Sequence, residues 1–440
     1  MKGNIVVLGC GWSGVIVSIH LKSLYPAAEV ICVDKSLDGG LLNSISIGPY
    51  TFDIGGSHVL FSKSRDVIDG IRSLGGEWIS RSRSAYVLLD GVFIPYPFEN
   101  GIYALPPERR VRYGLSLIGA LIRNREERRP VNFLDWIITM FGDEIARDYL
   151  IPYNEKIWKR PLNELSADWV YTPGRLPIPS LEDVVKAIAG IPTVGYAEQS
   201  MFYYPRRGGI KSQWNSAFKR AQKLGVRFVR DVVSEVRVLG RNEFVVNGRI
   251  RAGRLVSTIA IRDLIQMIKP EPPEDVLKVA SRLDYNSLIV VGIGLRSQAP
   301  PHHWVYVPDR RYVFHRYAWI SNYGEDTPPG HSTLIAEVTI PPGFEVDIEG
   351  VKHEVVQGLI ELSVIKEGSV DLVRAWFHRY GYPIYTLTHG QDTQTIEQYL
   401  AQMGIKSFGR WGNWQYWNTD TIYQKTKELK LYVVNNLINL

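Results

Sequence analysis

The sequence predicts an α/β protein in which a nucleotide-binding domain, discontinuous along the chain, carries a helical insertion and an antiparallel β-sheet domain. Three observations support this fold class. The first forty residues alternate strand, helix and strand around the glycine spacing GxGxxG. Prolines then break a helical pattern over residues 106–190 into short pieces. Alternating runs between residues 287 and 380 mostly lack intervening helices, which favours an antiparallel sheet.

The first element is a Rossmann-type βαβ unit. An apolar run, 4–8, leads into Gly-Cys-Gly-Trp-Ser-Gly, and a second apolar strand closes on Asp34. Gly9 permits the tight turn after the strand, Gly11 lets the backbone approach a pyrophosphate, and Gly14 lets the helix pack closely on the strand. Asp34 stands where an acid can hold ribose hydroxyls. The unit predicts a bound dinucleotide; the alternative is a glycine-rich turn that only packs.

The residues after Asp34 bear on which dinucleotide binds. Lys35 leads to Gly39-Gly40, and a second glycine pair, Gly55-Gly56, lies in another irregular stretch. Paired glycines suggest backbone lying against a flat ligand. The pattern resembles that of two-domain flavoproteins of the amine oxidase type, in which FAD lies extended beneath such loops. Two ordinary turns are the alternative.

The remaining elements follow in order. Two β-rich runs joined by Asp90-Gly91 predict a hairpin over 85–94. After the helical insertion, short strands return the chain to the nucleotide domain at 255–258. The segment from residue 391 onward is expected to be helical around a Trp- and Gly-rich turn. We assign residues 1–84, 195–260 and 385–440 to the FAD-binding domain, 100–194 to the helical domain, and 85–99 and 261–384 to the sheet domain for substrate.

The turn at residues 409–420 is the second strong signal. Asn418 or Asp420 can cap a helix that begins near Thr421. A helix N-terminus stabilises negative charge, such as that carried by a reduced flavin at its N1 and C2 carbonyl edge. The turn therefore suits a flavin site, although Asn and Asp also cap ordinary surface helices.

Composition sets broad limits. The 440 residues are 45% hydrophobic and include 12 Trp and 24 Tyr, which indicates a globular protein with aromatic-lined pockets. Cys10 and Cys32 are expected to be small buried hydrophobes rather than a disulfide framework. The net charge of +6 comes from dispersed basic residues, so no nucleic-acid groove is expected. Without a long apolar run, we expect a soluble cytoplasmic protein with no integral membrane segment.

Seven short motifs occur in an order that resembles the UDP-galactopyranose mutases of eukaryotes and some prokaryotes, over nearly the whole chain. They lie at residues 52–62, 95–100, 152–158, 204–209, 316–323, 381–383 and 409–420. The resemblance implies an FAD enzyme that must be reduced, by NAD(P)H or another reductant, yet causes no net redox change. In that family flavin N5 attacks the anomeric carbon, UDP leaves, and the sugar recloses as a furanose for cell-envelope glycan synthesis.

The resemblance also assigns roles to individual residues. Arg175 and Arg316 would hold the diphosphate, since the Arg fork meets phosphate oxygens in bidentate fashion, and with His58 they form the catalytic set. The tyrosines expected at the diphosphate and sugar are Tyr323, Tyr382 and Tyr416. The uridine pocket would be built from Tyr96, Phe98, Glu99, Tyr153, Asn154 and Trp158. The cofactor site would comprise Gly9, Gly11, Trp12, Ser13, Gly14, Asp34, Lys35, Gly40, Leu41, Gly55, Gly56, Ser57, His58, Val233, Arg410, Asn418 and Asp420, and no metal is expected.

The chain departs from the family at four points, one of which is that Ile210 and Lys211 follow Gly208-Gly209 in place of a further glycine-rich loop. The family has Gly-Gly-His where this chain has an additional residue, Ser57. Glu99 replaces a glutamine that contacts uracil, and an ionised carboxylate only accepts hydrogen bonds. The turn that starts at Gly409 is two residues shorter before Asn418.

Two other functions stay open. One is an FAD-dependent oxidoreductase of the amine oxidase or protoporphyrinogen oxidase type, which needs an apolar cavity and no paired arginines. The other is a non-enzymatic binding module, like the flavin-free chaperones of prenylated small GTPases on this scaffold. The partner expected from the main hypothesis is a small nucleotide sugar, and a homo-oligomer is left open.

Overall fold

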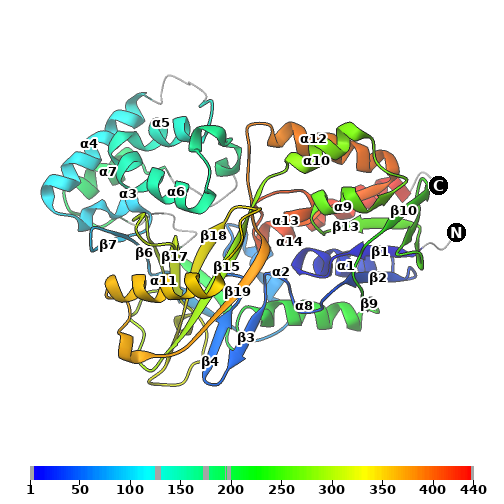
Figure 1. The fold of residues 1–440 in the computed structure, drawn as a ribbon, viewed down its shortest axis with the longest axis horizontal. Helices are drawn as coiled ribbons and strands as arrows, with labels where there is room; N and C mark the ends of the chain where they lie inside the picture. Colours follow the sequence, from blue (N-terminus) through cyan, green and yellow to red (C-terminus); the bar gives the residue numbers. More distant parts are fainter. Residues whose placement is uncertain (1–3, 124–129, 172–177, 194, 196–199, 438–440) are drawn as a thin grey trace.

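A computed structural model describes residues 4–123, 130–171, 178–193, 195 and 200–437 of the chain. Two large sheets organise it, and the helical segment lies at one end of the molecule (Figure 1). The predicted α/β fold class is confirmed. The division into three domains at the boundaries given above stays a prediction.

A five-stranded parallel sheet contains the N-terminal βαβ unit. Its strand order is β20 (Ile405–Ser407), β13 (Arg254–Ser257), β1 (Ile5–Leu8), β2 (Val30–Asp34) and β9 (Arg227–Arg230). Segments far apart in sequence therefore share one sheet. Helices α8 (Lys211–Lys223) and α14 (Thr419–Leu437) pack beside α1 (Trp12–Leu24), and the buried residues of α1 lie between them and the sheet.

One strand of this sheet, β20, contradicts the prediction for the C-terminal segment, which was helix around a Trp- and Gly-rich turn with no strand. Helix α12 (His389–Met403) ends at Gly404, which adopts the left-handed conformation with φ 78°. Residues Ile405 and Ser407 are then buried as β20 at the edge of the sheet. The error has a physical reason, because a three-residue strand is too short to show an alternating pattern.

The second large sheet has seven strands. Their order is β19 (Val370–Pro383), β15 (Tyr285–Leu295), β18 (Ser332–Ile340), β17 (Arg316–Trp319), β16 (Trp304–Tyr306), β6 (Ala85–Leu89) and β7 (Val92–Pro95). All neighbours are antiparallel except β16 and β6, which are parallel. The predicted hairpin is present as β6 and β7, and its turn residues Asp90 and Gly91 both have positive φ. Helix α11 (Ile348–Glu361) packs against this sheet (Figure 1).

The helical segment is built from short pieces, as the prolines predicted. It contains α3 (Phe98–Gly101), α4 (Pro107–Arg123), α5 (Phe133–Ile145), a π-helical turn (Ala146–Leu150), α6 (Ile151–Trp158) and α7 (Leu181–Ile188). Side-chain caps begin two of them, since Asn132 accepts from Asp135 N and Ser180 from Asp183 N. Buried aromatic residues such as Phe133 and Trp136 fill its interior.

Smaller elements complete the described chain. A four-stranded sheet has the order β12 (Ile250–Ala252), β11 (Glu243–Val246), β10 (Val236–Gly240) and β14 (Ile268–Lys269), beside α9 (Ile261–Met267) and α10 (Glu274–Arg282). Two-stranded sheets join β3 (Ser44–Ile47) to β4 (Tyr50–Asp53) and β5 (Trp78–Ser82) to β8 (Met201–Pro205). The remaining helices are α2 (Arg65–Arg72) and α13 (Gly409–Gly412).

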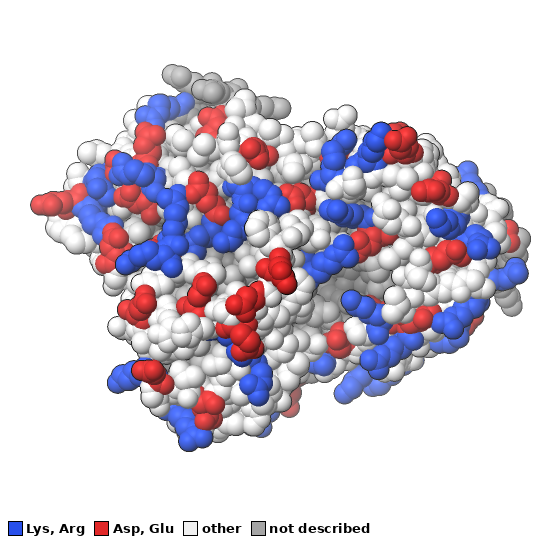
Figure 2. All heavy atoms as spheres, in the orientation of Figure 1, with Lys and Arg blue, Asp and Glu red and all other residues white. Residues whose placement is uncertain are grey.

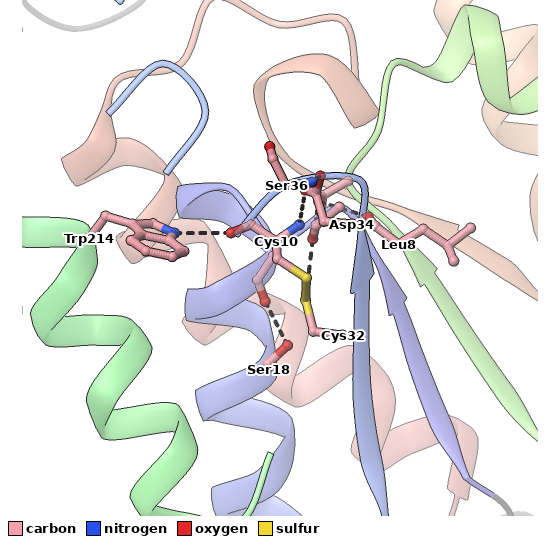
Figure 3. The surroundings of a disulfide bond; sticks show 10 residues. Leu8, Cys10, Ser18, Cys32, Asp34, Ser36 and Trp214 are labelled. Atoms are coloured by element: carbon pink, nitrogen blue, oxygen red, sulfur yellow. Dashed lines mark hydrogen bonds between the residues drawn. A yellow bond between two sulfur atoms is a disulfide. The ribbon is translucent and has the colours of Figure 1, made fainter. Parts of the chain in front are cut away.

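The two cysteines correct a second expectation. Both are buried, as predicted, but Cys10 and Cys32 are joined in a disulfide between the glycine loop and β2 (Figure 3). Their Cα atoms are 6.0 Å apart, a normal separation for a bridged pair. Sequence position alone did not reveal the pairing, because parallel neighbours in a sheet bring together residues that are 22 positions apart.

Charges of both signs are interleaved on the face shown in Figure 2. Over the helical segment, Arg112 forms ion pairs with Glu144 and Asp148, while Arg310 pairs with Glu155. Among the described residues, no helix is long and apolar enough to cross a membrane, and no cluster of side chains suits a metal ion.

Candidate cofactor and substrate site

A cavity of about 910 Å³ connects the two large sheets. At one end it is lined by Gly9 and Asp34, which follow or end strands of the parallel sheet. At the other end it is lined by Tyr306, Arg316 and Glu337 on strands of the antiparallel sheet. Ligands of open α/β sheets bind beyond the carboxyl ends of the strands, which is where this cavity begins.

The glycine loop at the first end has the geometry that its sequence predicted. Gly9 has a φ of 88°, and a Cβ atom on Gly14 would lie 1.8 Å from the Gly9 carbonyl oxygen. A Cβ atom on Gly11 would meet the Gly39 carbonyl oxygen at 3.9 Å, an ordinary contact distance, and Gly11 precedes α1 without a side-chain cap. The amides of the first helical turn are therefore free to meet an anion such as a pyrophosphate.

Asp34 lines the cavity beside this loop. Its carboxylate accepts hydrogen bonds from Cys10 N at 2.6 Å and Ser36 N at 3.0 Å. Burial raises the pKa of Asp34, although the two amides oppose the shift. A carboxylate held by backbone amides keeps further lone pairs for hydroxyl donors such as those of a ribose.

The loops at Gly39-Gly40 and Gly55-Gly56 form the cavity wall next to the loop Gly9 to Gly14. Gly39 and Gly40 both have positive φ, and a Cβ atom on Gly55 would lie 2.1 Å from the Leu41 carbonyl oxygen. Gly40, Leu41 and Gly55 line the cavity. The close approach of these loops fits the expectation of backbone against a flat ligand, and the whole set of loops fits an FAD-sized dinucleotide.

A buried ion pair lies where the cavity meets the antiparallel sheet. Arg316 on β17 and Glu337 on β18 approach with Nε–Oε1 at 2.8 Å and Nη2–Oε2 at 2.9 Å. Glu337 also accepts from Ser57 N at 3.0 Å and from the Tyr382 hydroxyl at 3.0 Å. Burial favours a higher pKa for Glu337, but Arg316 and then His315 outweigh it and lower the pKa to about 2.

His58 lies in the cavity wall above this pair. Its Nδ1 is 2.9 Å from the Gly56 carbonyl oxygen, which therefore fixes the hydrogen on Nδ1. Burial lowers the pKa of His58 to about 4, and the charges of Arg410 and Arg316 act in the same direction. The ring is consequently neutral at pH 7.

Ser57, the residue before His58, is held by two contacts. In addition to the contact of its amide with Glu337, the Ser57 hydroxyl is 2.7 Å from the hydroxyl of Tyr323. These contacts attach the loop to the antiparallel sheet and the turn that follows β17. Tyr323 itself is fully buried and lies behind the cavity wall rather than in it.

Aromatic rings line the second end of the cavity. Tyr96 and Tyr306 have ring centroids 5.0 Å apart, and those of Tyr382 and Tyr416 are 5.6 Å apart. The guanidinium of Arg410 lies 4.5 Å from the centre of the Tyr416 ring. A planar base, a sugar and a phosphate group can therefore all find suitable contacts in this region.

No family model matches the sequence. A crystal structure of reduced UDP-galactopyranose mutase superposes with a TM-score of 0.89, covering 99% of this chain and 94% of that chain at 24% identity. The chain has the fold of this mutase. The predicted resemblance is confirmed at the level of the fold.

Other solved structures share the fold at greater distance. A protein from Exiguobacterium assigned as a protoporphyrinogen oxidase gives a TM-score of 0.72 at 16% identity, covering 98% of this chain and 99% of that chain. A redesigned putrescine oxidase gives 0.64 at 14% identity, covering 98% of this chain and 99% of that chain. A mutase and oxidases thus share this fold, and the fold alone does not distinguish their activities.

The structure brings most of the predicted residues to one cavity of the mutase fold. Those that line it are Gly9, Gly11, Trp12, Ser13, Asp34, Lys35, Gly40, Leu41, Gly55, Ser57, His58, Tyr96, Val233, Arg316, Tyr382, Arg410, Tyr416 and Asn418. Their roles in binding or catalysis stay predictions.

Other predicted residues do not line the cavity that the described residues form. Phe98, Glu99, Tyr153, Asn154 and Trp158 pack behind it. The Asn154 side chain is occupied within its own helix, accepting from Trp158 Nε1 and donating to the Leu150 carbonyl. Gly14, Gly56, Tyr323 and Asp420 also stand back from the cavity, and Arg175 lies outside the described residues.

The C-terminal turn reaches the cavity at the start of a helix, as predicted. Helix α14 begins at Thr419, two residues before the predicted Thr421, and the Asn418 carbonyl accepts from Ile422 N. Trp12 Nε1 donates to the Thr419 carbonyl at 3.0 Å, which joins the starts of α1 and α14. Two helix N-termini therefore stand at this cavity.

Several lining residues were not assigned to the site from the sequence, among them Arg83, Trp304, Tyr306 and Glu337. Trp417 and Thr419 also line the cavity and belong to the predicted turn at residues 409–420. Glu337 carried a usable signal, because a carboxylate inside the apolar strand 332–340 requires a partner when buried. The side chains of Trp304 and Tyr306 follow the two-residue period of a strand, which places both on one face.

Proposed function

We propose that this chain is an FAD-dependent mutase that interconverts UDP-galactopyranose and UDP-galactofuranose. The observation that supports the proposal is one continuous cavity with a dinucleotide loop at one end and an arginine and tyrosine cluster at the other. An oxidase of this fold has no need for a charged guanidinium beside its flavin. The likeness in fold to the mutase agrees with this assignment.

The glycine loops, Asp34 and the start of α14 would hold FAD. When bound and reduced, FAD supplies a nucleophilic ring nitrogen for the anomeric carbon of the sugar. NAD(P)H or another reductant would keep it reduced. His58, neutral and with hydrogen on Nδ1, leaves its Nε2 as an acceptor at this part of the site.

Arg316 would bind the diphosphate, aided by Arg175. The Arg316 guanidinium is always charged, so it can stabilise the negative charge that develops on the departing diphosphate. Glu337 holds one side of the fork, which leaves the remaining N–H groups for phosphate oxygens. The Tyr382 hydroxyl donates to the same carboxylate and would contact the sugar or phosphate.

Turnover by the reduced protein tests this proposal. Protein reduced with dithionite under anaerobic conditions is incubated with UDP-galactofuranose, and the nucleotide sugars are separated by chromatography. We expect UDP-galactopyranose to form only with the reduced protein. Absence of product, together with oxygen consumption on adding amines or porphyrinogens to the oxidised protein, would instead establish the oxidoreductase alternative.

A matched pair of variants tests the role of Arg316. Arg316→Lys keeps the charge but loses the bidentate fork, so kcat/KM should fall about 100-fold, equivalent to about 2.7 kcal/mol. Arg311→Lys is the control, because Arg311 is exposed and pairs only with neighbouring Asp309 among the ion pairs described. Equal activity in the two variants would remove Arg316 from the mechanism.

A further inference from the structure

The disulfide lies directly beneath the cofactor loop. Cys10 is the middle residue of Gly9-Cys10-Gly11, whose two glycines line the cavity, whereas neither cysteine does so. Cys32 is fully buried in β2 and is paired in register with Val7 of β1. The bond therefore ties the loop to the strand that ends in Asp34 (Figure 3).

The backbone of Cys10 also holds neighbouring parts of the site. Its amide donates to the Asp34 carboxylate at 2.6 Å, and its carbonyl accepts from Trp214 Nε1 of α8 at 2.9 Å. Cys32 precedes Asp34 by two residues on the same strand. The disulfide thus restrains both partners of the hydrogen bond that orients Asp34 toward the cavity.

We infer that the Cys10–Cys32 disulfide keeps the glycine loop in its dinucleotide-binding form, so that reduction of this bond weakens retention of the cofactor. In the step proposed, a dithiol gives two electrons and two protons to the S–S bond. The bond breaks to two thiols, and the dithiol becomes a disulfide. This inference rests on the proposed dinucleotide cofactor, and it adds a redox-sensitive control that is separate from the redox state of the flavin.

The fold has room for the reduced form. The Cys32 Sγ atom lies 3.4 Å from the Gly9 carbonyl oxygen, so a free thiol there has an acceptor without rearrangement of the core. Loss of the bond would leave the loop held by hydrogen bonds alone. A loop that samples more conformations binds its ligand more weakly, since only the competent fraction binds.

Burial of both sulfurs predicts a reciprocal effect. Cys10 and Cys32 are 1% and 0% exposed, so a dithiol reaches them only when the loop opens. A bound dinucleotide would hold the loop closed and protect the disulfide. By linkage, if the intact bond favours the dinucleotide, then the dinucleotide must favour the intact bond.

Mass spectrometry and binding measurements on the full-length protein test the inference. The unreduced chain, denatured in an alkylating reagent, should take up no label, and labelling of both cysteines would overturn the inference at once. The Kd for FAD, and for ADP as a probe of the loop alone, is then compared before and after treatment with dithiothreitol. We expect the Kd for both to rise at least about tenfold on reduction.

Two variants distinguish the effect of losing the disulfide from the effect of changing the cysteine side chains. Cys32→Ala and Cys10→Ala/Cys32→Ala should each bind FAD like the reduced wild-type chain, and dithiothreitol should change neither. If a variant does not fold, the oxidised and reduced wild-type chains still provide the comparison. Equal Kd values for oxidised and reduced wild type would overturn the inference but not the proposed function, whereas failure of the oxidised chain to bind FAD would overturn the proposed function.

Discussion

At the scale of single residues, buried ionisable groups determine the charge distribution in the site. Glu337 is 1% exposed and remains ionised because Arg316 is paired with it. Glu99 is also buried but has no ion-pair partner among the described residues, and burial raises its pKa to about 8. The pKa values of the two carboxyl groups are therefore shifted in opposite directions.

Removal of the Glu337 charge should destabilise the protein and weaken UDP binding. Glu337→Gln leaves Arg316 without its ionised partner, which for a buried pair costs about 3 kcal/mol of unfolding free energy. Urea unfolding measures the loss. Glu349→Gln is the control, since Glu349 is exposed and pairs with Lys352 on the surface of α11. A change in Glu337→Gln no larger than in this control would contradict the assigned ion pair.

The two pKa values also predict where stability depends on pH. The pKa of Glu337 is lowered to about 2, so its contribution is complete above its unfolded value of 4.5 and is lost as the pH falls toward 2. The pKa of Glu99 is raised to about 8, so its contribution is complete below 4.5 and is lost as the pH rises through 8.

The variant Glu99→Gln tests the loss of stability at high pH that we expect from Glu99. The variant has no carboxyl group to ionise, so its stability relative to wild type should improve between pH 5 and pH 9, by on the order of 3 kcal/mol. Chemical unfolding at several pH values measures this change, and Glu182→Gln on exposed α7 should show none. A stability difference that is constant with pH would mean that Glu99 is ionised in the folded protein.

At the scale of elements, the parts with strong local signals could be predicted from sequence. The βαβ unit, the Asp90-Gly91 hairpin and strand 332–340 follow from glycine spacing, turn chemistry and apolar pattern. β20 and the disulfide could not be predicted, because each depends on which distant segment becomes a neighbour. The lining residues Arg83 and Tyr306 were missed for the same reason, since their role depends on where the two sheets meet.

The close contact of Gly14 in α1 with the loop after β1 leaves no room for an additional methyl group. Gly14→Ala would place a Cβ atom 1.8 Å from the Gly9 carbonyl oxygen, so the helix must shift away from the loop. We expect a lower melting temperature and little FAD in the purified protein. Gly119→Ala in α4 is the matched control, because its Cβ meets only the end of Arg123 and alanine favours a helix. FAD content like that of wild type in Gly14→Ala would contradict the assigned loop geometry.

At the scale of the whole molecule, function depends on how the two sheets are joined. The cofactor loops and His58 reach the cavity from the parallel sheet and its neighbouring loops, whereas Arg316, Glu337 and Tyr382 come from the antiparallel sheet. Glu337 links both sides, because it accepts from Ser57 N as well as from Arg316. We therefore expect one cavity to receive FAD and a nucleotide sugar together.

Titration of the flavin spectrum with UDP and UDP-sugars, under anaerobic reducing conditions, tests whether FAD and the nucleotide sugar share this cavity. We expect a yellow protein whose reduced flavin spectrum changes saturably with UDP-galactose and UDP, and changes less in Arg316→Lys. A flavin spectrum that no uridine nucleotide perturbs would contradict a shared cavity, and a colourless protein that takes up no FAD would contradict the cofactor itself.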